Sequence, residues 1–106
     1  MITVTFTESG EKLSLRLEGH AGYAEHGKDI VCASASILAY TLASIVDAFN
    51  KKVESFVDLT SGDTTIECEC KDKDTFIGVK NAYIYTLIGY ALLEHNYPQY
   101  VRLIRL

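Results

Sequence analysis

Two stretches near the start of the chain alternate hydrophobic and polar residues with a period of two. The first is Ile2–Thr7 (ITVTFT) and the second is Leu13–Glu18 (LSLRLE). This alternation places the apolar side chains on one face, which is typical of half-buried β-strands. A short turn sequence, ESGEK, lies between the two stretches. We therefore predict a β-hairpin at the start of the chain.

A long apolar segment follows with a different period. From Ile30 to about Asn50, hydrophobic residues recur at steps of three and four, which predicts a helix. Asp29 directly precedes this segment, and aspartate is a favoured N-cap because its carboxylate accepts N–H groups of the first turn. The segment is apolar on much of its circumference, so we expect it to cross the sheet centrally.

The second half of the chain repeats this arrangement of a hairpin and a helix. VESFVDLT and TTIECEC flank the turn SGD, and Cys68 and Cys70 share the face of Ile66, so they are predicted to lie in the core. Helical spacing then begins after Asp72 or Asp74 and ends near His95–Asn96. The tail YVRLIRL predicts a final strand.

These elements follow the order β-β-α-β-β-α-β. The short turns within each strand pair predict a mainly antiparallel sheet. Two apolar helices on one face of that sheet make a two-layer α+β sandwich. With 106 residues, the chain is expected to form a single domain over residues 1–106.

Composition and charge narrow the functional classes. The net charge of −4 argues against direct nucleic-acid binding, which requires a basic patch. The three cysteines and the absence of a signal-peptide pattern at the start predict reduced thiols and a cytoplasmic protein. Polar residues interrupt the longest apolar run, Ile30–Phe49, so we expect it to fall short of a transmembrane helix and expect no membrane contact.

Cys32 lies at a position that favours a reactive thiolate. Cys32 is the third residue of the predicted first helix, where the helix dipole and unpaired N–H groups stabilise a thiolate. His20 follows the second strand and is a candidate base with a fixed backbone direction. His26 lies on the glycine-containing loop from Gly22 to Lys28, which we expect to be mobile, and is a poorer candidate. Asp29 either orients His20 or only caps the helix.

Each of these residues also has a non-catalytic interpretation. A cysteine in an apolar helix more often serves packing, and a histidine after a glycine can be a turn residue. A thiol redox role is not favoured, because no resolving cysteine lies near Cys32 in the sequence. A metal site of His20, His26 and Cys32 has loose spacing and too few ligands, so no metal is predicted. The chain has no phosphate-binding glycine motif.

The stretch from Gly19 to Ser36 resembles the motif of the ribosomal-processing cysteine protease family called Prp. The matching residues are Gly19-His20-Ala21, a short glycine-containing loop, Gly27-Lys28-Asp29-Ile30-Val31-Cys32-Ala33 and then Ser36. The chain length and the order of elements are also similar to those of the family. The motif is specific in residue types and spacing, whereas the rest of the chain matches only in pattern.

The resemblance implies a bacterial cytoplasmic endopeptidase that removes an N-terminal extension from a large-subunit ribosomal protein. It implies Cys32 as the nucleophile and His20 as the catalytic histidine, with Asp29 and Ser36 in supporting positions. It implies a homodimer, and it implies that the loop between His20 and Cys32 admits the peptide. The loop residues expected at the substrate are Gly22, Tyr23, His26 and Gly27.

The expected mechanism is acyl transfer without a metal or organic cofactor. The Cys32 thiolate attacks the scissile carbonyl, N–H groups at the helix start stabilise the oxyanion, and His20 acts as general acid and base. The main alternative is a non-catalytic module that binds a ribosomal component. Cleavage of an extended ribosomal protein would discriminate between the two.

Overall fold

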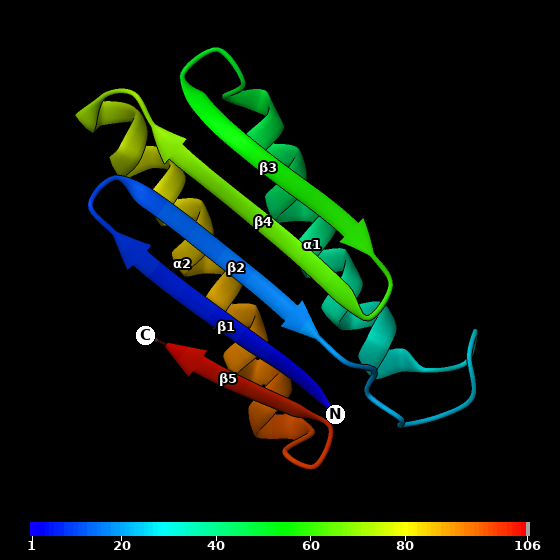
Figure 1. Cartoon of the computed structure of the whole chain (residues 1–106). Helices are drawn as coiled ribbons and strands as arrows, with labels where there is room; N and C mark the ends of the chain where they lie inside the picture. Colours follow the sequence, from blue (N-terminus) through cyan, green and yellow to red (C-terminus); the bar gives the residue numbers. More distant parts are fainter. Residues whose placement is uncertain (106) are drawn as a thin grey trace.

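The fold was analysed in a computed structural model of the chain, which describes residues 1–105. It confirms the predicted order of elements and the α+β class (Figure 1). The elements are β1 (Ile2–Ser9), β2 (Lys12–Glu18), α1 (Ile30–Ala48), β3 (Val53–Thr60), β4 (Asp63–Cys70), α2 (Lys73–Asn96) and β5 (Val101–Arg105).

The strands form one five-stranded sheet in the order β3-β4-β2-β1-β5. Three neighbouring pairs are antiparallel, and β5 pairs with β1 in parallel. The sheet is therefore mixed, with antiparallel pairing dominant as predicted. The pairing of β2 with β4 brings the end of β2 beside the turn between β3 and β4, since Glu18 lies opposite Asp63. This pairing positions the candidate site described below.

Both helices cover the same face of the sheet, as Figure 1 shows. The apolar residues predicted on the inward faces of β1 and β2 are buried, and so are Cys68 and Cys70 of β4. Two buried tyrosines of α2 tie the layers together, because Tyr83 Oη donates to the carbonyl of Ile66 at 2.9 Å and Tyr90 Oη donates to the carbonyl of Ala35 at 2.8 Å. Buried hydroxyls need such partners, so these tyrosines fix how α2 packs on β4 and α1.

The expectation that the Ile30–Phe49 run falls short of a transmembrane helix is wrong by length and composition. Mean hydropathy reaches 1.7 within α1 and 1.3 within α2, and both helices are long enough to span a bilayer. The scattered serines and threonines of α1 lower its hydropathy little, and its Ser34, Thr41 and Ser44 hydroxyls each donate to a carbonyl one turn earlier. Core helices of globular domains pass the same test. Both helices pack on the sheet, with 33% of the apolar window of α1 and 28% of that of α2 buried.

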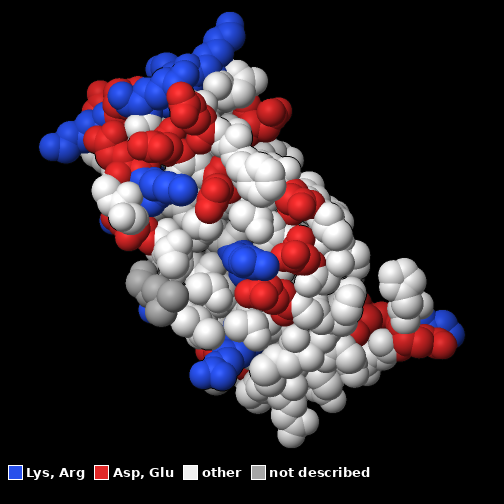
Figure 2. Space-filling view, viewed as in Figure 1, with Lys and Arg blue, Asp and Glu red and all other residues white. Residues whose placement is uncertain are grey.

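Charged side chains are unevenly distributed over the open face of the sheet. Figure 2 shows acidic and basic groups gathered around the end that carries the β1–β2 turn. Charges are sparser toward the opposite end in this view. There Arg16 forms ion pairs with Glu18 at 3.5 Å and Asp63 at 3.3 Å near the end of β2, and Lys28 and Glu25 form an ion pair at 3.0 Å in the projecting loop between β2 and α1. The candidate site therefore lies at the less charged end of the molecule.

Candidate active site

His20 lies just beyond the end of β2 on a backbone held from two sides. The carbonyl of His20 accepts a hydrogen bond from the backbone nitrogen of Met1 at 2.6 Å. The preceding residue, Gly19, donates its N–H to the carbonyl of Gly62 at 2.9 Å and has φ of +92°. A Cβ at Gly19 would collide with the carbonyl oxygen of Met1, so only glycine fits. These contacts fix the backbone from which the His20 imidazole projects.

Cys32 lies in the first turn of α1, as predicted. Its side chain is half-buried, and its Sγ accepts a hydrogen bond from the N–H of Ala21 at 3.4 Å. Ala21 itself is buried in the core and directly follows His20. The start of the loop therefore contacts the thiol, although eleven positions separate the two residues.

Asp29 is the N-cap of α1 and also holds the loop. One carboxylate oxygen accepts the N–H groups of Val31 at 3.0 Å and Cys32 at 2.9 Å. The other oxygen accepts those of Tyr23 at 3.0 Å and Ala24 at 3.3 Å. Desolvation acts to raise the pKa of Asp29, but these four hydrogen bonds outweigh it and lower the pKa below its ordinary value. Within residues 1–105 Asp29 forms no hydrogen bond to His20, so the capping interpretation is the one that the structure supports.

This capping changes one expectation about the oxyanion. The N–H groups of Val31 and Cys32 are bonded to the Asp29 carboxylate, and the N–H of Ala33 is bonded to its backbone carbonyl at 3.0 Å. The sequence predicted that N–H groups at the helix start would be free to face a substrate, and for these three the prediction is wrong. The N–H that points at the thiol comes instead from Ala21 in the loop.

The loop between His20 and Asp29 is anchored by an aromatic contact as well. The ring of Tyr23 packs edge-on against Tyr97 at 5.6 Å and against Tyr100 at 5.2 Å between ring centroids. Tyr97 and Tyr100 border the turn between α2 and β5. Tyr23 is therefore directed toward this turn and is not among the residues that line the pocket. Its predicted contact with the substrate stays a prediction.

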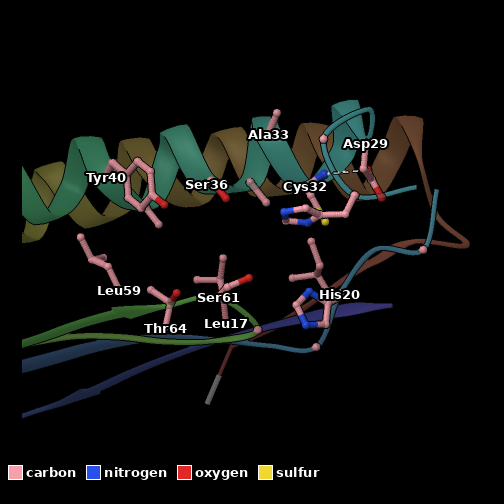
Figure 3. Close-up of a pocket in the computed structure, with 18 of the residues that line it drawn as sticks. Leu17, His20, Asp29, Cys32, Ala33, Ser36, Tyr40, Leu59, Ser61 and Thr64 are labelled. Carbon is pink, nitrogen blue, oxygen red and sulfur yellow. Dashed lines mark hydrogen bonds between the residues drawn. The ribbon is translucent and has the colours of Figure 1, made fainter. Parts of the chain in front are cut away.

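Cys32 and His20 line the same pocket of about 700 Å³. Figure 3 shows Cys32 on the α1 side of the pocket and His20 on the sheet side. Ser36 lies one helical turn beyond Cys32, and Gly22, His26 and Gly27 of the loop also border the pocket. Their predicted contact with the substrate stays a prediction. No hydrogen bond joins the His20 and Cys32 side chains within residues 1–105. Such contacts are often long in a free enzyme and shorten when substrate binds.

Sequence reasoning missed the contribution of the β3–β4 hairpin to the pocket. The turn SGD was predicted, but its position beside His20 depends on the strand order, which alternation along the chain does not reveal. Tyr40, about two helical turns beyond Cys32, was also missed, although its spacing of four residues from Ser36 places both on one face of α1. The additional lining residues from α1 and the hairpin are Ala33, Ala35, Ala39, Tyr40, Leu59, Ser61, Gly62 and Thr64.

The charge of the pocket limits what it can bind. Asp29 is its one carboxylate-bearing residue, and the residues lining it include no lysine or arginine. Within residues 1–105, no group of three or more histidine, cysteine, aspartate or glutamate side chains could hold a metal ion.

We expect iodoacetamide to label Cys32 alone in the folded protein at pH 7–8. Cys68 and Cys70 are 1% and 3% exposed. Burial raises the pKa of the Cys68 thiol and raises that of Cys70 to about 12, so neither presents a thiolate in this range. Intact-protein mass should show one adduct on the native protein and three after unfolding in guanidinium. Labelling of all three thiols at similar rates in the native protein would contradict this assignment.

We expect Asp29→Asn to release the loop while keeping the helix cap. An asparagine has one acceptor oxygen in place of two, so it can cap α1 but cannot also accept the N–H groups of Tyr23 and Ala24. Hydrogen exchange at those two amides should become faster, whereas Asp29→Ala should in addition destabilise the fold by about 1 kcal/mol. The matched control is Asp72→Asn, which alters the N-cap of α2 and should leave the loop amides unchanged.

The stability difference between wild type and Asp29→Asn should depend on pH in a defined direction. Because the pKa of Asp29 is lowered in the folded state, its ionised form favours folding. The difference should be fully present above the ordinary value of 3.8 and should disappear as pH falls through the lower, folded-state pKa. Urea unfolding at several pH values measures it, and a difference that grows on acidification would contradict the assignment.

Comparison with known proteins gives the same family as the sequence motif. A family model described as cysteine protease Prp matches residues 1–102. The ribosomal processing cysteine protease Prp of Bacillus subtilis (strain 168) is 40% identical over 48 residues, and this match spans 43% of this chain and 43% of that relative.

Two solved structures are similar over the whole chain. A crystal structure of an essential ribosomal processing protease Prp from Staphylococcus aureus, in complex with a covalently linked product peptide, has a TM-score of 0.81 and 26% identity, and the match covers 100% of both chains. A crystal structure from Streptococcus mutans has a TM-score of 0.68 and 28% identity, and the match covers 100% of this chain and 96% of that one. The motif, the fold and the family match agree, and the chain belongs to the Prp family of cysteine proteases.

Proposed function

We propose that this protein is a cysteine endopeptidase that removes an N-terminal extension from a large-subunit ribosomal protein. The observation that carries the proposal is the placement of Cys32 and His20 on opposite sides of one pocket in a chain of the Prp family. The relative from Bacillus subtilis is named a ribosomal processing protease, and the Staphylococcus aureus relative holds a covalently linked product peptide. These relatives support the peptide substrate and the ribosomal assignment.

The proposed reaction begins with acylation of Cys32. The Cys32 thiolate attacks the carbonyl carbon of the scissile bond, and the carbon–sulfur bond forms as the carbonyl oxygen becomes an oxyanion. The N–H of Ala21, whose nitrogen lies 3.4 Å from Sγ, is the proposed donor to that oxyanion. His20 then gives a proton to the leaving amine as the carbon–nitrogen bond breaks, which leaves a thioester on Cys32.

Deacylation reverses the role of His20. A water molecule loses a proton to the imidazole and attacks the thioester carbon. The carbon–sulfur bond breaks, the thiolate is regenerated and the new carboxyl group leaves. His20 lies across the pocket from Cys32, which leaves room between them for the substrate carbonyl.

The lining of the pocket, which has no lysine or arginine, favours a protein partner over RNA. A non-catalytic module that binds ribosomal RNA would need cations at its contact surface. Among residues 1–105, no lysine or arginine lines this pocket. A non-catalytic module that binds a ribosomal protein fits the pocket equally well. The two differ in whether a peptide bond is broken, so the test must detect the product.

The proposal extends to the assembly and location of the protein. We propose a homodimer, supported by the large apolar side chains that α2 leaves exposed, which are Ile77, Ile84, Tyr85, Ile88 and Leu92. We also propose a cytoplasmic location, where ribosomal proteins are made and where the three free cysteines would stay reduced. Light scattering of the purified protein measures the oligomeric state.

The test is incubation of the protein with a ribosomal precursor that carries its extension. We expect mass spectrometry to find a single hydrolysed bond at the extension junction. In ¹⁸O-labelled water the new carboxyl group should gain one ¹⁸O atom, as hydrolysis of a thioester requires. Binding of the precursor without any cleavage would favour the non-catalytic module.

A further inference from the structure

Gly62, in the turn between β3 and β4, lies directly against the imidazole of His20. A Cβ placed on Gly62 would be 2.7 Å from Nε2 and 2.9 Å from Cε1 of that ring. Both distances are shorter than carbon side chains tolerate, so the imidazole occupies the space that any other residue at position 62 would need. The residue that touches the reactive edge of His20 is therefore a glycine from a different hairpin.

The turn is held in this place by the backbone. Glu18 pairs with Asp63 at the end of the β2–β4 ladder, and the carbonyl of Gly62 accepts the N–H of Gly19 at 2.9 Å. The residue that carries this N–H immediately precedes His20. One hydrogen bond thus joins the backbone next to His20 to the turn that contacts its ring. Figure 3 shows Ser61 of the same turn on the same side of the pocket as His20.

We propose that Gly62 is a positioning residue that sets the direction of the His20 imidazole toward Cys32. The proposal rests on the proposed role of His20 in proton transfer. Without a side chain at position 62, the Nε2–Cε1 edge of the ring lies directly against the turn, on the pocket that His20 shares with Cys32. With one there, the ring must turn away from it.

A substitution at Gly62 should change the direction of the ring and spare the fold. His20 is exposed, so its side chain can rotate with little effect on packing. Gly10 provides a matched control, since it lies in the β1–β2 turn at the far end of the sheet. It has φ of +59°, compared with +80° for Gly62, and a Cβ there would have no atom within 4 Å. Gly10→Ala introduces the same kind of backbone strain with no effect on His20.

The direct test is NMR on the free protein, which is independent of any cleavage activity. The wild type should show nuclear Overhauser contacts between the His20 ring protons and the Gly62 α-protons. Gly62→Ala should move the His20 ring resonances, and Gly10→Ala should leave them in place, while both variants keep similar melting temperatures. Absence of the contacts in the wild type would overturn the proposal even if the protein proves to be a protease.

The functional test separates positioning from simple obstruction of the pocket. Gly62→Ala should lower kcat on the order of 100-fold, as expected for a misplaced catalytic group, and Gly10→Ala should not. Peptide affinity measured in a Cys32→Ala background should be the same with and without Gly62→Ala. Loss of affinity, or wild-type kcat in Gly62→Ala, would overturn the positioning role. If Cys32→Ala itself cleaves the substrate, the proposed function fails and the NMR result still decides where the ring points.

Discussion

We expect Cys32→Ala to reduce cleavage of the extended ribosomal protein by roughly 10⁴-fold or more, because no other group in the pocket can form the thioester. The pocket holds no second thiol, since Cys68 and Cys70 are buried in the core. The measurement is the product mass over time at equal protein concentrations. Cys32→Ser should be similarly inactive, because a hydroxyl is far less ionised than a thiol at neutral pH.

The controls for Cys32 address stability. Removing Sγ deletes one hydrogen bond from Ala21 N–H, which should cost about 1 kcal/mol or less. The melting temperature should therefore change little. Cys68→Ala makes the same substitution in the core and should lower stability yet keep activity below its melting temperature. Full cleavage by Cys32→Ala would remove this residue from the mechanism.

The second large effect is expected for His20→Ala, with a loss of roughly 10²–10⁴-fold in kcat. The loss is smaller than for Cys32 because solvent can still supply and accept protons. Since the side chain of His20 is exposed and its backbone carries the structural contacts, the fold should be unaffected. Added imidazole should restore part of the activity, because it can enter the space that the ring leaves.

His26→Ala is the matched control for His20. His26 also borders the pocket but lies on the loop, and its substitution should change kcat only a few-fold. Iodoacetamide labelling of Cys32 in both variants shows whether the thiol stays accessible. Equal losses in the two variants would argue that the histidines serve the loop and not proton transfer.

The sequence predicted the scaffold well because its elements have strong local signals. Alternation identified the strands, helical spacing identified both helices, and Asp29 marked the start of α1 to the residue. The parallel pairing of β5 with β1 has no such signal, because it joins the two ends of the chain. The position of Cys32 in the first turn followed from Asp29 alone, so this part of the site was predictable from local sequence.

The parts of the site that were not predicted depend on contacts between distant segments. The Asp29 carboxylate divides its two oxygens between the helix and the loop, and only the folded loop geometry shows this. The contact of Gly62 with His20 joins two hairpins whose order in the sheet is not encoded locally. For the same reason the packing of the Tyr23 ring against Tyr97 and Tyr100 was not predicted.

The packing of Tyr23 against those two tyrosines has a practical consequence. The chain contains no tryptophan, so its near-ultraviolet circular dichroism arises chiefly from tyrosine, and closely packed rings contribute the strongest signals. Tyr23 is the loop member of the cluster and Tyr97 and Tyr100 are the fixed members. The difference spectrum between wild type and Tyr23→Leu therefore isolates the docked loop. The protein therefore carries its own label-free optical signal that reports whether the loop beside Cys32 is docked or free.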